Sequence, residues 1–179
     1  MIFKFNLYQR AFSIILLCPL IVFFHVNVTF AQTVVSNKGD ITGLPLPRFV
    51  SVKSNKVNVR RGPNSTYQID WVYTRAGVPL KITAEYGNWR RVEDFQGEGG
   101  WIHARLLSGK RFVIFLEKES ILKRRPNKKA PSVAIIQQGV IGRFLSIAGN
   151  WCQVSVEGYS GWVSRDLVWG AIGNKTSEH

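Results

Sequence analysis

The chain has 179 residues, and its 24 lysines and arginines outnumber 11 aspartates and glutamates, which gives a net charge of +13. Three histidines and two cysteines supply neither a spaced metal-ligand cluster nor a disulfide framework, so we predict no metal, no cofactor and no disulfide scaffold. A surface this positive attracts anions through a field that salt weakens, although such charge can also serve solubility alone. Both interpretations of the charge stay open.

The first 31 residues have the layout of a secretory signal peptide. Lys4 and Arg10 make a positive start, residues 11–24 are almost wholly apolar, and Ala31 precedes a cleavage point that would leave Gln32 first. The alternative is an uncleaved anchor, but an apolar run of about fourteen residues is shorter than the roughly 20 that a spanning helix needs. We therefore predict export across the inner membrane, a periplasmic location and no stable membrane span after cleavage.

Short strands are expected along the rest of the chain. Residues 32–47 are polar and rich in glycine and proline, which is typical of a linker. Beyond Pro47 the apolar residues alternate with period two, and turn residues interrupt them. The expected strands are 49–53, 57–59, 71–74, 78–84, 89–94 and 101–103, then 112–116, 120–123, 133–136, 140–147, 151–156 and 161–163. This pattern predicts an all-β fold of small barrels.

The two halves of this strand pattern are copies of one module. Four landmarks recur in the same order at offsets of 61 to 63 positions: residues 60–64, 76–78, 88–92 and 100–102 match residues 123–127, 138–140, 150–154 and 161–163. Repetition of this kind indicates the architecture before any single element is assigned. We therefore predict one domain at 48–110, a second at 111–172, and a tail at 173–179.

The first copy resembles a bacterial SH3 (SH3b) domain. The residues that carry the resemblance are VNVRRGP at 57–63, GVP at 77–79, GNWRRV at 87–92, GWI at 100–102 and LL at 106–107. The second copy is similar but has Arg125 where the first has Gly62. The tract from Pro47 to Lys110 is also similar to the exported tandem SH3-like proteins of alphaproteobacteria. The resemblance covers residues 48–172 and implies two tandem SH3-like β-barrels that bind cell-wall peptides, glycans or other proteins.

Trp89 and Trp151 are candidate ligand-binding residues. Each lies three positions before a valine that is expected to point inward, Val92 or Val154. Side chains alternate along a strand, so the two tryptophans belong to the outer face. There a flat ring can stack on a sugar or a peptide, or a loop can fold over it so that it covers the barrel. Both interpretations stay open.

Basic residues lead into a turn at matching positions of the two copies, and we predict that they flank a ligand groove. The candidate binding residues are Arg60, Arg61, Tyr67, Tyr86 and Trp89 in the first copy and Lys123, Arg124, Arg125 and Trp151 in the second. Guanidinium groups pair with carboxylates through two parallel hydrogen bonds, which suits the peptides of a bacterial cell wall. The alternative is a solvated charged turn in each copy.

Trp101, Trp162 and Cys152 are expected to be structural. The two tryptophans follow a glycine at the start of a strand, and Cys152 falls on the inward side, where a thiol behaves as a small apolar group. A cysteine nucleophile needs a histidine beside it. After signal removal only His103, in the other copy, and the last residue, His179, remain. We therefore predict no catalytic residues.

These observations predict an exported, non-catalytic binding protein whose tandem modules recognise peptidoglycan or another anionic component of the cell envelope. The alternative is a protein–protein adaptor that scaffolds an envelope complex. Nucleic acid is not the expected partner, because an exported basic protein meets envelope polymers instead. A hydrolase is a third hypothesis, and a loss of turnover in a Cys152→Ala variant would support it.

Overall fold

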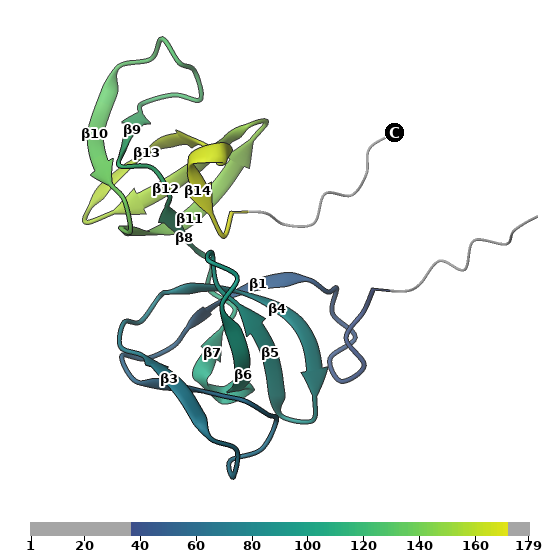
Figure 1. Ribbon diagram of the computed structural model, residues 1–179. Helices are drawn as coiled ribbons and strands as arrows, with labels where there is room; N and C mark the ends of the chain where they lie inside the picture. The colour runs from purple at the N-terminus through teal and green to yellow at the C-terminus, as the bar shows by residue number, and fades with distance from the viewer. Residues whose placement is uncertain (1–36, 172–179) are drawn as a thin grey trace, which may run out of the picture. The chain divides into compact units, whose positions relative to one another are not determined.

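A computed structural model describes residues 37–171 as an all-β protein with two short 3-10 helices (Figure 1). The predicted signal peptide at 1–31 and the predicted tail at 173–179 lie outside the described residues. Within residues 37–171 no helix has the length and apolar character needed to cross a membrane. The expected all-β class, with two small barrels in tandem, is confirmed.

The first barrel is one antiparallel sheet with the strand order β3-β2-β6-β5-β4-β1-β7. Its elements are β1 (Arg48–Val52), β2 (Val57–Arg60), β3 (Ile69–Tyr73), β4 (Pro79–Tyr86), β5 (Trp89–Glu93), β6 (Gly99–His103), the 3-10 helix η1 (Ala104–Leu106) and β7 (Leu107–Ser108). Figure 1 shows β4, β5 and β6 side by side, and these three strands carry the residues discussed below.

The second barrel repeats this order with every strand number raised by seven, β10-β9-β13-β12-β11-β8-β14. Its elements are β8 (Phe112–Phe115), β9 (Glu119–Lys123), β10 (Ser132–Gln137), β11 (Ile141–Ala148), β12 (Trp151–Val156), β13 (Tyr159–Ser164), the 3-10 helix η2 (Arg165–Leu167) and β14 (Val168–Trp169). The topology therefore confirms the internal duplication that the sequence predicts.

Each barrel has its own hydrophobic core, formed by the inward residues of alternating strands. In the first, the buried residues are Val50, Val52, Val57, Val59, Leu80, Ile82, Val92 and Ile102. In the second they are Val113, Phe115, Leu122, Ile136, Phe144, Cys152, Val154, Val156, Val163, Val168 and Ala171. No residue belongs to both clusters. The alternation of buried and exposed side chains along β5 and β12 is the period-two pattern read from the sequence.

Tight turns at equivalent places join β4 to β5 and β11 to β12. Gly87 and Gly149 occupy these turns with φ angles of 49° and 54°. That left-handed conformation carries a steric penalty for residues with a Cβ and none for glycine. The turns place the tryptophan that starts each following strand, Trp89 or Trp151, at the same position in both barrels.

The segment before β1, expected to be a linker, is hydrogen-bonded to the first barrel over its described part. Its backbone closes a loop in which Gly39 N donates to Leu44 O at 2.8 Å and Leu46 N donates to Asn37 O at 2.6 Å. The carboxylate of Glu85 on β4 accepts from the Thr42 backbone N at 2.9 Å and from its hydroxyl at 2.7 Å. Glu85 therefore attaches this loop to the sheet.

Glu85 also neutralises two arginines under the loop. Its side chain is fully buried and lies 2.6 Å from Arg48 Nη2 and 3.5 Å from Arg90 Nε. Burial by itself would raise the pKa of this carboxyl, but the hydrogen bonds from Thr42 and Arg48 and the charge of Arg48 together lower it to about 2. The group is consequently an anion at every physiological pH.

The cross-strand pair of Glu85 and Arg90 has an apolar counterpart in the second barrel. Glu85 lies opposite Arg90 in the register of β4 and β5, whereas Ile147 lies opposite Cys152 in the register of β11 and β12. The Arg90 guanidinium is buried and also donates to the Gly87 and Trp89 carbonyls, at 2.9 and 2.8 Å. The same ladder position is thus occupied by an ion pair in the first copy and by two uncharged side chains, the exposed Ile147 and the buried Cys152, in the second.

Candidate functional site

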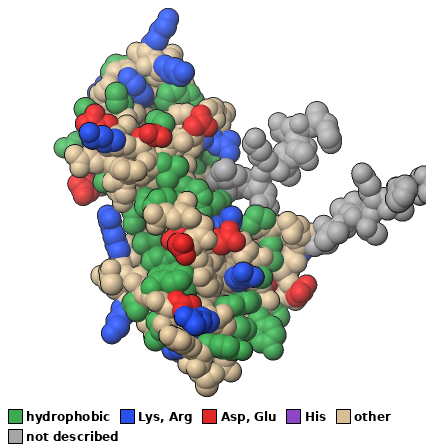
Figure 2. Space-filling model, in the orientation of Figure 1, with side chains coloured by type: hydrophobic (Ala, Val, Ile, Leu, Met, Phe, Trp, Pro, Cys, Tyr) green, Lys and Arg blue, Asp and Glu red, His purple; other side chains and the backbone are tan. Residues whose placement is uncertain are grey.

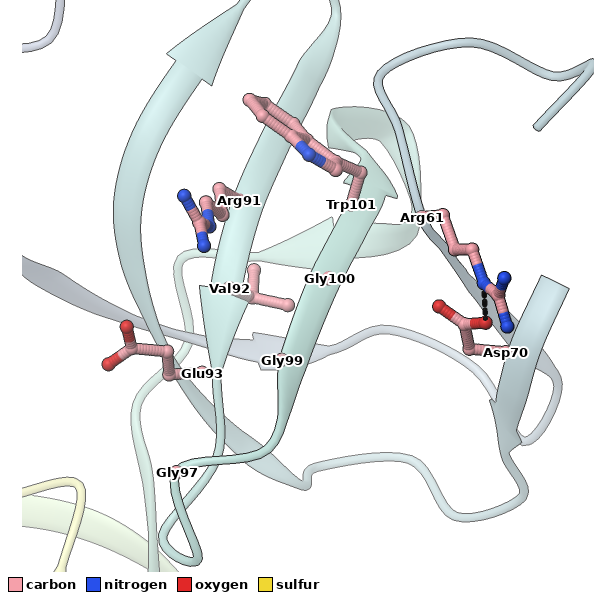
Figure 3. A pocket seen from close by; sticks show the side chains of 9 residues that line it. All are labelled: Arg61, Asp70, Arg91, Val92, Glu93, Gly97, Gly99, Gly100 and Trp101. Atoms are coloured by element: carbon pink, nitrogen blue, oxygen red, sulfur yellow. Dashed lines mark hydrogen bonds and ion pairs between the residues drawn. The ribbon is translucent and has the colours of Figure 1, made fainter. Parts of the chain in front are cut away.

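The first barrel has a polar hollow of about 480 Å³ on the outer side of β5 and β6 (Figure 3). Its lining residues are Arg61, Asp70, Arg91, Val92, Glu93, Gly97, Gly99, Gly100 and Trp101. Arg91 and Trp101 are directly opposite each other in the ladder between β5 and β6, so a cation and an aromatic ring project together beside this hollow. This arrangement suits an anionic ligand with a flat face.

Two glycines line the hollow at the start of β6. Gly99 and Gly100 occupy β6 where a larger side chain would collide with the neighbouring strands. A Cβ at Gly99 would meet the Val92 carbonyl oxygen, and one at Gly100 would lie 2.6 Å from Val59 Cγ1. The absence of side chains therefore lets the strands approach closely just before Trp101.

The predicted cations of the first copy are already bound within the chain. Arg61 Nε lies 2.6 Å from Asp70 Oδ1, the contact drawn as a dashed line in Figure 3. Arg60 Nη1 donates to the Tyr67 carbonyl at 2.5 Å. The Tyr67 ring lies against Gly62, because a Cβ there would be 2.6 Å from ring atom Cε2. The turn of the first copy is therefore folded on itself.

Trp89 is half-buried on the outer face of β5, separate from the hollow. Its ring meets the His103 ring edge-on, with centroids 5.3 Å apart and planes at 72°. His103 Nδ1 accepts a hydrogen bond from Arg105 N at 3.3 Å, which orients the imidazole. Tyr86 is opposite Trp89 across the turn and is 64% exposed. The structure thus separates the predicted binding set of the first copy into two places, Arg61 beside Trp101 and Tyr86 beside Trp89.

The second barrel has an apolar groove of about 290 Å³ at the position that Trp89 and His103 occupy in the first. We call it the Trp151 groove, and its lining residues are Glu119, Ile121, Lys123, Lys128, Trp151, Ser164 and Leu167. Trp151 is opposite Ser164 in the ladder, as Trp89 is opposite His103. Ile121 is 45% exposed beside it. Of the residues predicted for the second copy, Lys123 and Trp151 line this groove.

The turn between β9 and β10 adds charge beside the groove. Five cations occur in residues 123–129, namely Lys123, Arg124, Arg125, Lys128 and Lys129, and all but the half-buried Lys123 are exposed. Figure 2 shows lysine and arginine side chains gathered at the tip of this turn. In residues 37–171 none of these five cations forms an ion pair. The predicted basic residues of the second copy are therefore available to a ligand.

Some contributors to these sites were not predicted from the sequence. Trp101 and Trp162, expected to be structural, are half-buried and belong to neither core cluster, and Trp101 lines the hollow. The sequence pattern could have indicated that both tryptophans point outward. Each one directly precedes a residue that is fully buried, Ile102 or Val163, and side chains alternate along a strand. Arg91, beside Trp101, was also missed, since its relevance depends on the register between β5 and β6.

Cys152 is fully buried beside Val154 in the second core. Burial raises the pKa of its thiol to about 11, even though the charges of Arg165 and Arg111 act in the opposite direction. Such a thiol is protonated at neutral pH and is a poor nucleophile. No group of three potential metal ligands was found in the described part of the chain.

We expect Cys152 to resist modification while the chain is folded. In a chain begun at Gln32, which has no other cysteine, a colorimetric disulfide reagent at pH 8 should react more than about tenfold slower with the native protein than with the urea-unfolded protein. The unfolded sample is the control for reagent quality. Equal rates would show that the thiol is accessible and would reopen the nucleophile hypothesis.

Comparison with known proteins gives a match to one family. The sequence profile of the bacterial SH3 domain matches residues 53–109 and again residues 117–170. The two matched segments fall on the two sheets described above. No curated protein matches the chain.

The chain also has a low similarity to several solved structures. They include NlpC2 and NlpC1 from Trichomonas vaginalis, at 12% and 13% identity with a TM-score of 0.33 each, and an NlpC/P60 family protein from Bacillus cereus, at 11% identity with a TM-score of 0.31. The matches cover 74%, 68% and 69% of this chain and 51%, 45% and 57% of those proteins. The chain thus spans about half the length of these proteins.

Proposed function

Because the chain belongs to the bacterial SH3 domain family, we propose that it is an exported, non-catalytic protein that binds peptidoglycan or another anionic polymer of the cell envelope. One observation carries this proposal. In each barrel a half-buried tryptophan on the outer face lies beside a cation, Trp101 next to Arg91 and Trp151 next to Lys123. An aromatic face provides stacking and the cation pairs with a carboxylate, which are the two contacts that a wall fragment offers.

The charge distribution supports the same proposal. Both copies are basic, because residues 48–110 carry 11 basic and 5 acidic side chains and residues 111–172 carry 9 and 4. A field of this sign concentrates an anionic polymer near the surface before specific contacts form. The buried, protonated Cys152 thiol and the placement of His103 in the other barrel support a role in binding over one in catalysis.

A co-sedimentation experiment with purified sacculi tests the proposal. We expect the protein to pellet with the sacculi at low ionic strength. Because screening shortens the reach of charges from about 30 Å at 0.01 M salt to about 3 Å at 1 M, the bound fraction should fall steeply as salt is added. An uncharged insoluble polysaccharide is the control. Failure to pellet with sacculi at any salt concentration would reject the wall polymer as the ligand.

The adaptor function is a second candidate, favoured by the exposed edge strands. β3 and β10 are at the ends of their sheets, and β10 presents Ile135 with 63% of its surface exposed. An unpaired strand edge with apolar side chains can accept a strand from another protein. Binding that ignores salt and saturates with one envelope protein would favour this function.

A further inference from the structure

We propose that the carboxylate-bearing peptide of the wall polymer binds in the Trp151 groove of the second barrel, and that the equivalent place over Trp89 in the first barrel does not bind it. This inference rests on the proposed function. The two copies share a topology, yet they differ at this place in three respects: the space over the tryptophan, the state of the cations and the covering of the turn.

The space over the tryptophan is filled in the first copy and open in the second. In the first, the His103 ring is packed edge-on against Trp89. In the second, Ser164 is at the His103 position. Its hydroxyl donates to Asp166 Oδ2 at 3.4 Å and accepts from Asn150 Nδ2 at 3.5 Å. A small side chain held by these contacts leaves the Trp151 groove free for a ligand.

The cations of the turn have a carboxylate partner in the first copy and none among the described residues in the second. Arg61 is paired with Asp70, and Arg60 is bonded to the Tyr67 carbonyl. By contrast, the five cations of residues 123–129 form no ion pair with any described residue. Lys128 lines the groove from this turn, and the aligned position of the first copy is Ser65. A carboxylate over Trp151 would therefore meet Lys123 and Lys128, which form no ion pair with a described residue, whereas the exposed Arg91 of the first copy lies opposite Trp101 and not opposite Trp89.

The turn itself is covered in the first copy and uncovered in the second. Tyr67 packs on Gly62, whereas the aligned residues of the second copy are Ala130 and Arg125. Arg125 of the second copy replaces the glycine of the first, and Ala130 replaces the tyrosine whose ring would cover this position. The apolar floor of the groove between Ile121 and Leu167 is thus bordered by accessible positive charge.

This combination selects the peptide part of the wall polymer over its glycan part. Lys123 donates to the Ser132 hydroxyl at 3.3 Å, a neutral acceptor, so a neutral sugar chain on the Trp151 ring would leave the charges of Lys123 and Lys128 uncompensated. An extended peptide with free carboxylates uses both, because an apolar side chain can be placed on the ring while the carboxylates face the turn. Charge complementarity therefore identifies an acidic peptide as the occupant.

A reciprocal exchange tests the assignment. The probe is the disaccharide–peptide fragment that muramidase releases from peptidoglycan, and the affinity is measured by calorimetry with purified wild type, Ser164→His and His103→Ser proteins. We expect Ser164→His to weaken binding by about tenfold or more and His103→Ser to leave affinity and a stoichiometry of one unchanged. Both positions are on the outer face, so we expect both variants to fold. Near-ultraviolet circular dichroism and urea unfolding check this.

Charge variants give a second, independent measurement. A Lys123→Gln and Lys128→Gln double variant should lose about tenfold or more in affinity. The matched Lys53→Gln and Lys56→Gln pair removes two exposed lysines that line neither the hollow nor the groove, and it should bind like the wild type. In the wild-type protein, nuclear magnetic resonance should show the Trp151 indole signal moving on titration and the Trp89 signal staying in place. This last readout does not depend on any variant folding.

The outcomes separate the inference from the function on which it rests. Unchanged affinity in Ser164→His, or a moving Trp89 signal, would overturn the assignment to the second copy while wall binding remained. Equal affinity for the disaccharide without its peptide would overturn the peptide as ligand. If the wild type binds neither the fragments nor sacculi, the proposed function fails and the assignment fails with it.

Discussion

Replacement of Glu85 by Gln is expected to destabilise the first barrel by roughly 2–4 kcal/mol, because it leaves two buried or half-buried guanidinium groups without their anion. The Arg90 side chain is only 9% exposed and the Arg48 side chain 17%, so water replaces the lost carboxylate poorly. The variant also replaces one of the two carboxylate oxygens that accept from Thr42 by an amide NH2 group, which cannot accept, so the attachment of the loop at 37–46 to the sheet should weaken. Urea unfolding followed through amide signals of each barrel separately would measure the loss.

A matched control for Glu85 lies on the same sheet. Glu93 pairs with Lys81 at 2.7 Å, but both side chains are about one-third exposed. Glu93→Gln should therefore cost less than about 1 kcal/mol, as is usual for surface pairs. Equal effects of the two substitutions would contradict a special role for Glu85, and so would a loss confined to the second barrel.

The pH dependence provides a further check on Glu85. Its pKa is about 2 in the folded chain against an ordinary value of 4.5, so the folded state favours the ionised form. The resulting stability is fully present above pH 4.5 and is lost as the pH falls towards 2. The unfolding free energy of the wild-type first barrel should decline through this window, and that of Glu85→Gln should decline less. Parallel curves would contradict the contribution of this carboxylate.

Replacement of Cys152 by Arg should unfold the second barrel, with a loss on the order of 3–5 kcal/mol, although arginine occupies the aligned position of the first copy. Cys152 is fully buried among core residues, and its cross-strand neighbour is Ile147 instead of a carboxylate. The guanidinium would then be buried without an anion. Loss of the amide signals of the second barrel, with those of the first retained, is the expected result.

Two further variants show whether charge causes this effect. Cys152→Ala removes only the sulfur atom and should cost about 1 kcal/mol. Adding Ile147→Glu to Cys152→Arg recreates the pair found in the first barrel and should recover part of the stability. A stable Cys152→Arg single variant would show that the arginine side chain can reach solvent from this position. If the double variant is no more stable than the single one, the size of the arginine side chain, and not its unpaired charge, causes the loss of stability.

A comparison of the first strands supports the same logic. Arg48 starts β1 and pairs with Glu85, whereas the aligned Arg111 precedes β8 and stacks over the Phe144 ring, 4.2 Å from its centroid. The second copy has no counterpart of the Glu85 carboxylate, and Arg111 makes a cation–π contact with Phe144 instead. The aligned arginines of the two copies therefore have different partners, a carboxylate in the first and an aromatic ring in the second.

Much of the architecture was predictable from local pattern. Alternation along residues 89–94 indicates that Val92 points inward and Trp89 outward, and the structure agrees. The recurrence of the Gly-Trp step at 100–101 and 161–162 indicates a repeated module, and the two sheets have the same strand order. These features can be predicted from residues close in sequence, because strand alternation and turn formation each depend on only a few consecutive positions.

The site was predictable only in part. Trp151 and Lys123 were identified as candidates and line the same groove, but Ile121 was missed. Whether an outward tryptophan is accessible depends on the residue opposite it, which is His103 for Trp89 and Ser164 for Trp151. Nothing in the local sequence of either tryptophan specifies that neighbour.

The positions of strands and turns and the duplication of the module therefore follow from the order of residues along the chain, since alternation and glycine-rich turns are short-range properties. The accessibility of a ring and the freedom of a cation arise in the folded sheets. They depend on partners far away in the sequence, such as Glu85 for Arg48, Asp70 for Arg61 and His103 for Trp89. Two copies with one fold can therefore differ in what they bind, because side chains brought together by strand pairing either satisfy one another or leave a contact for a ligand.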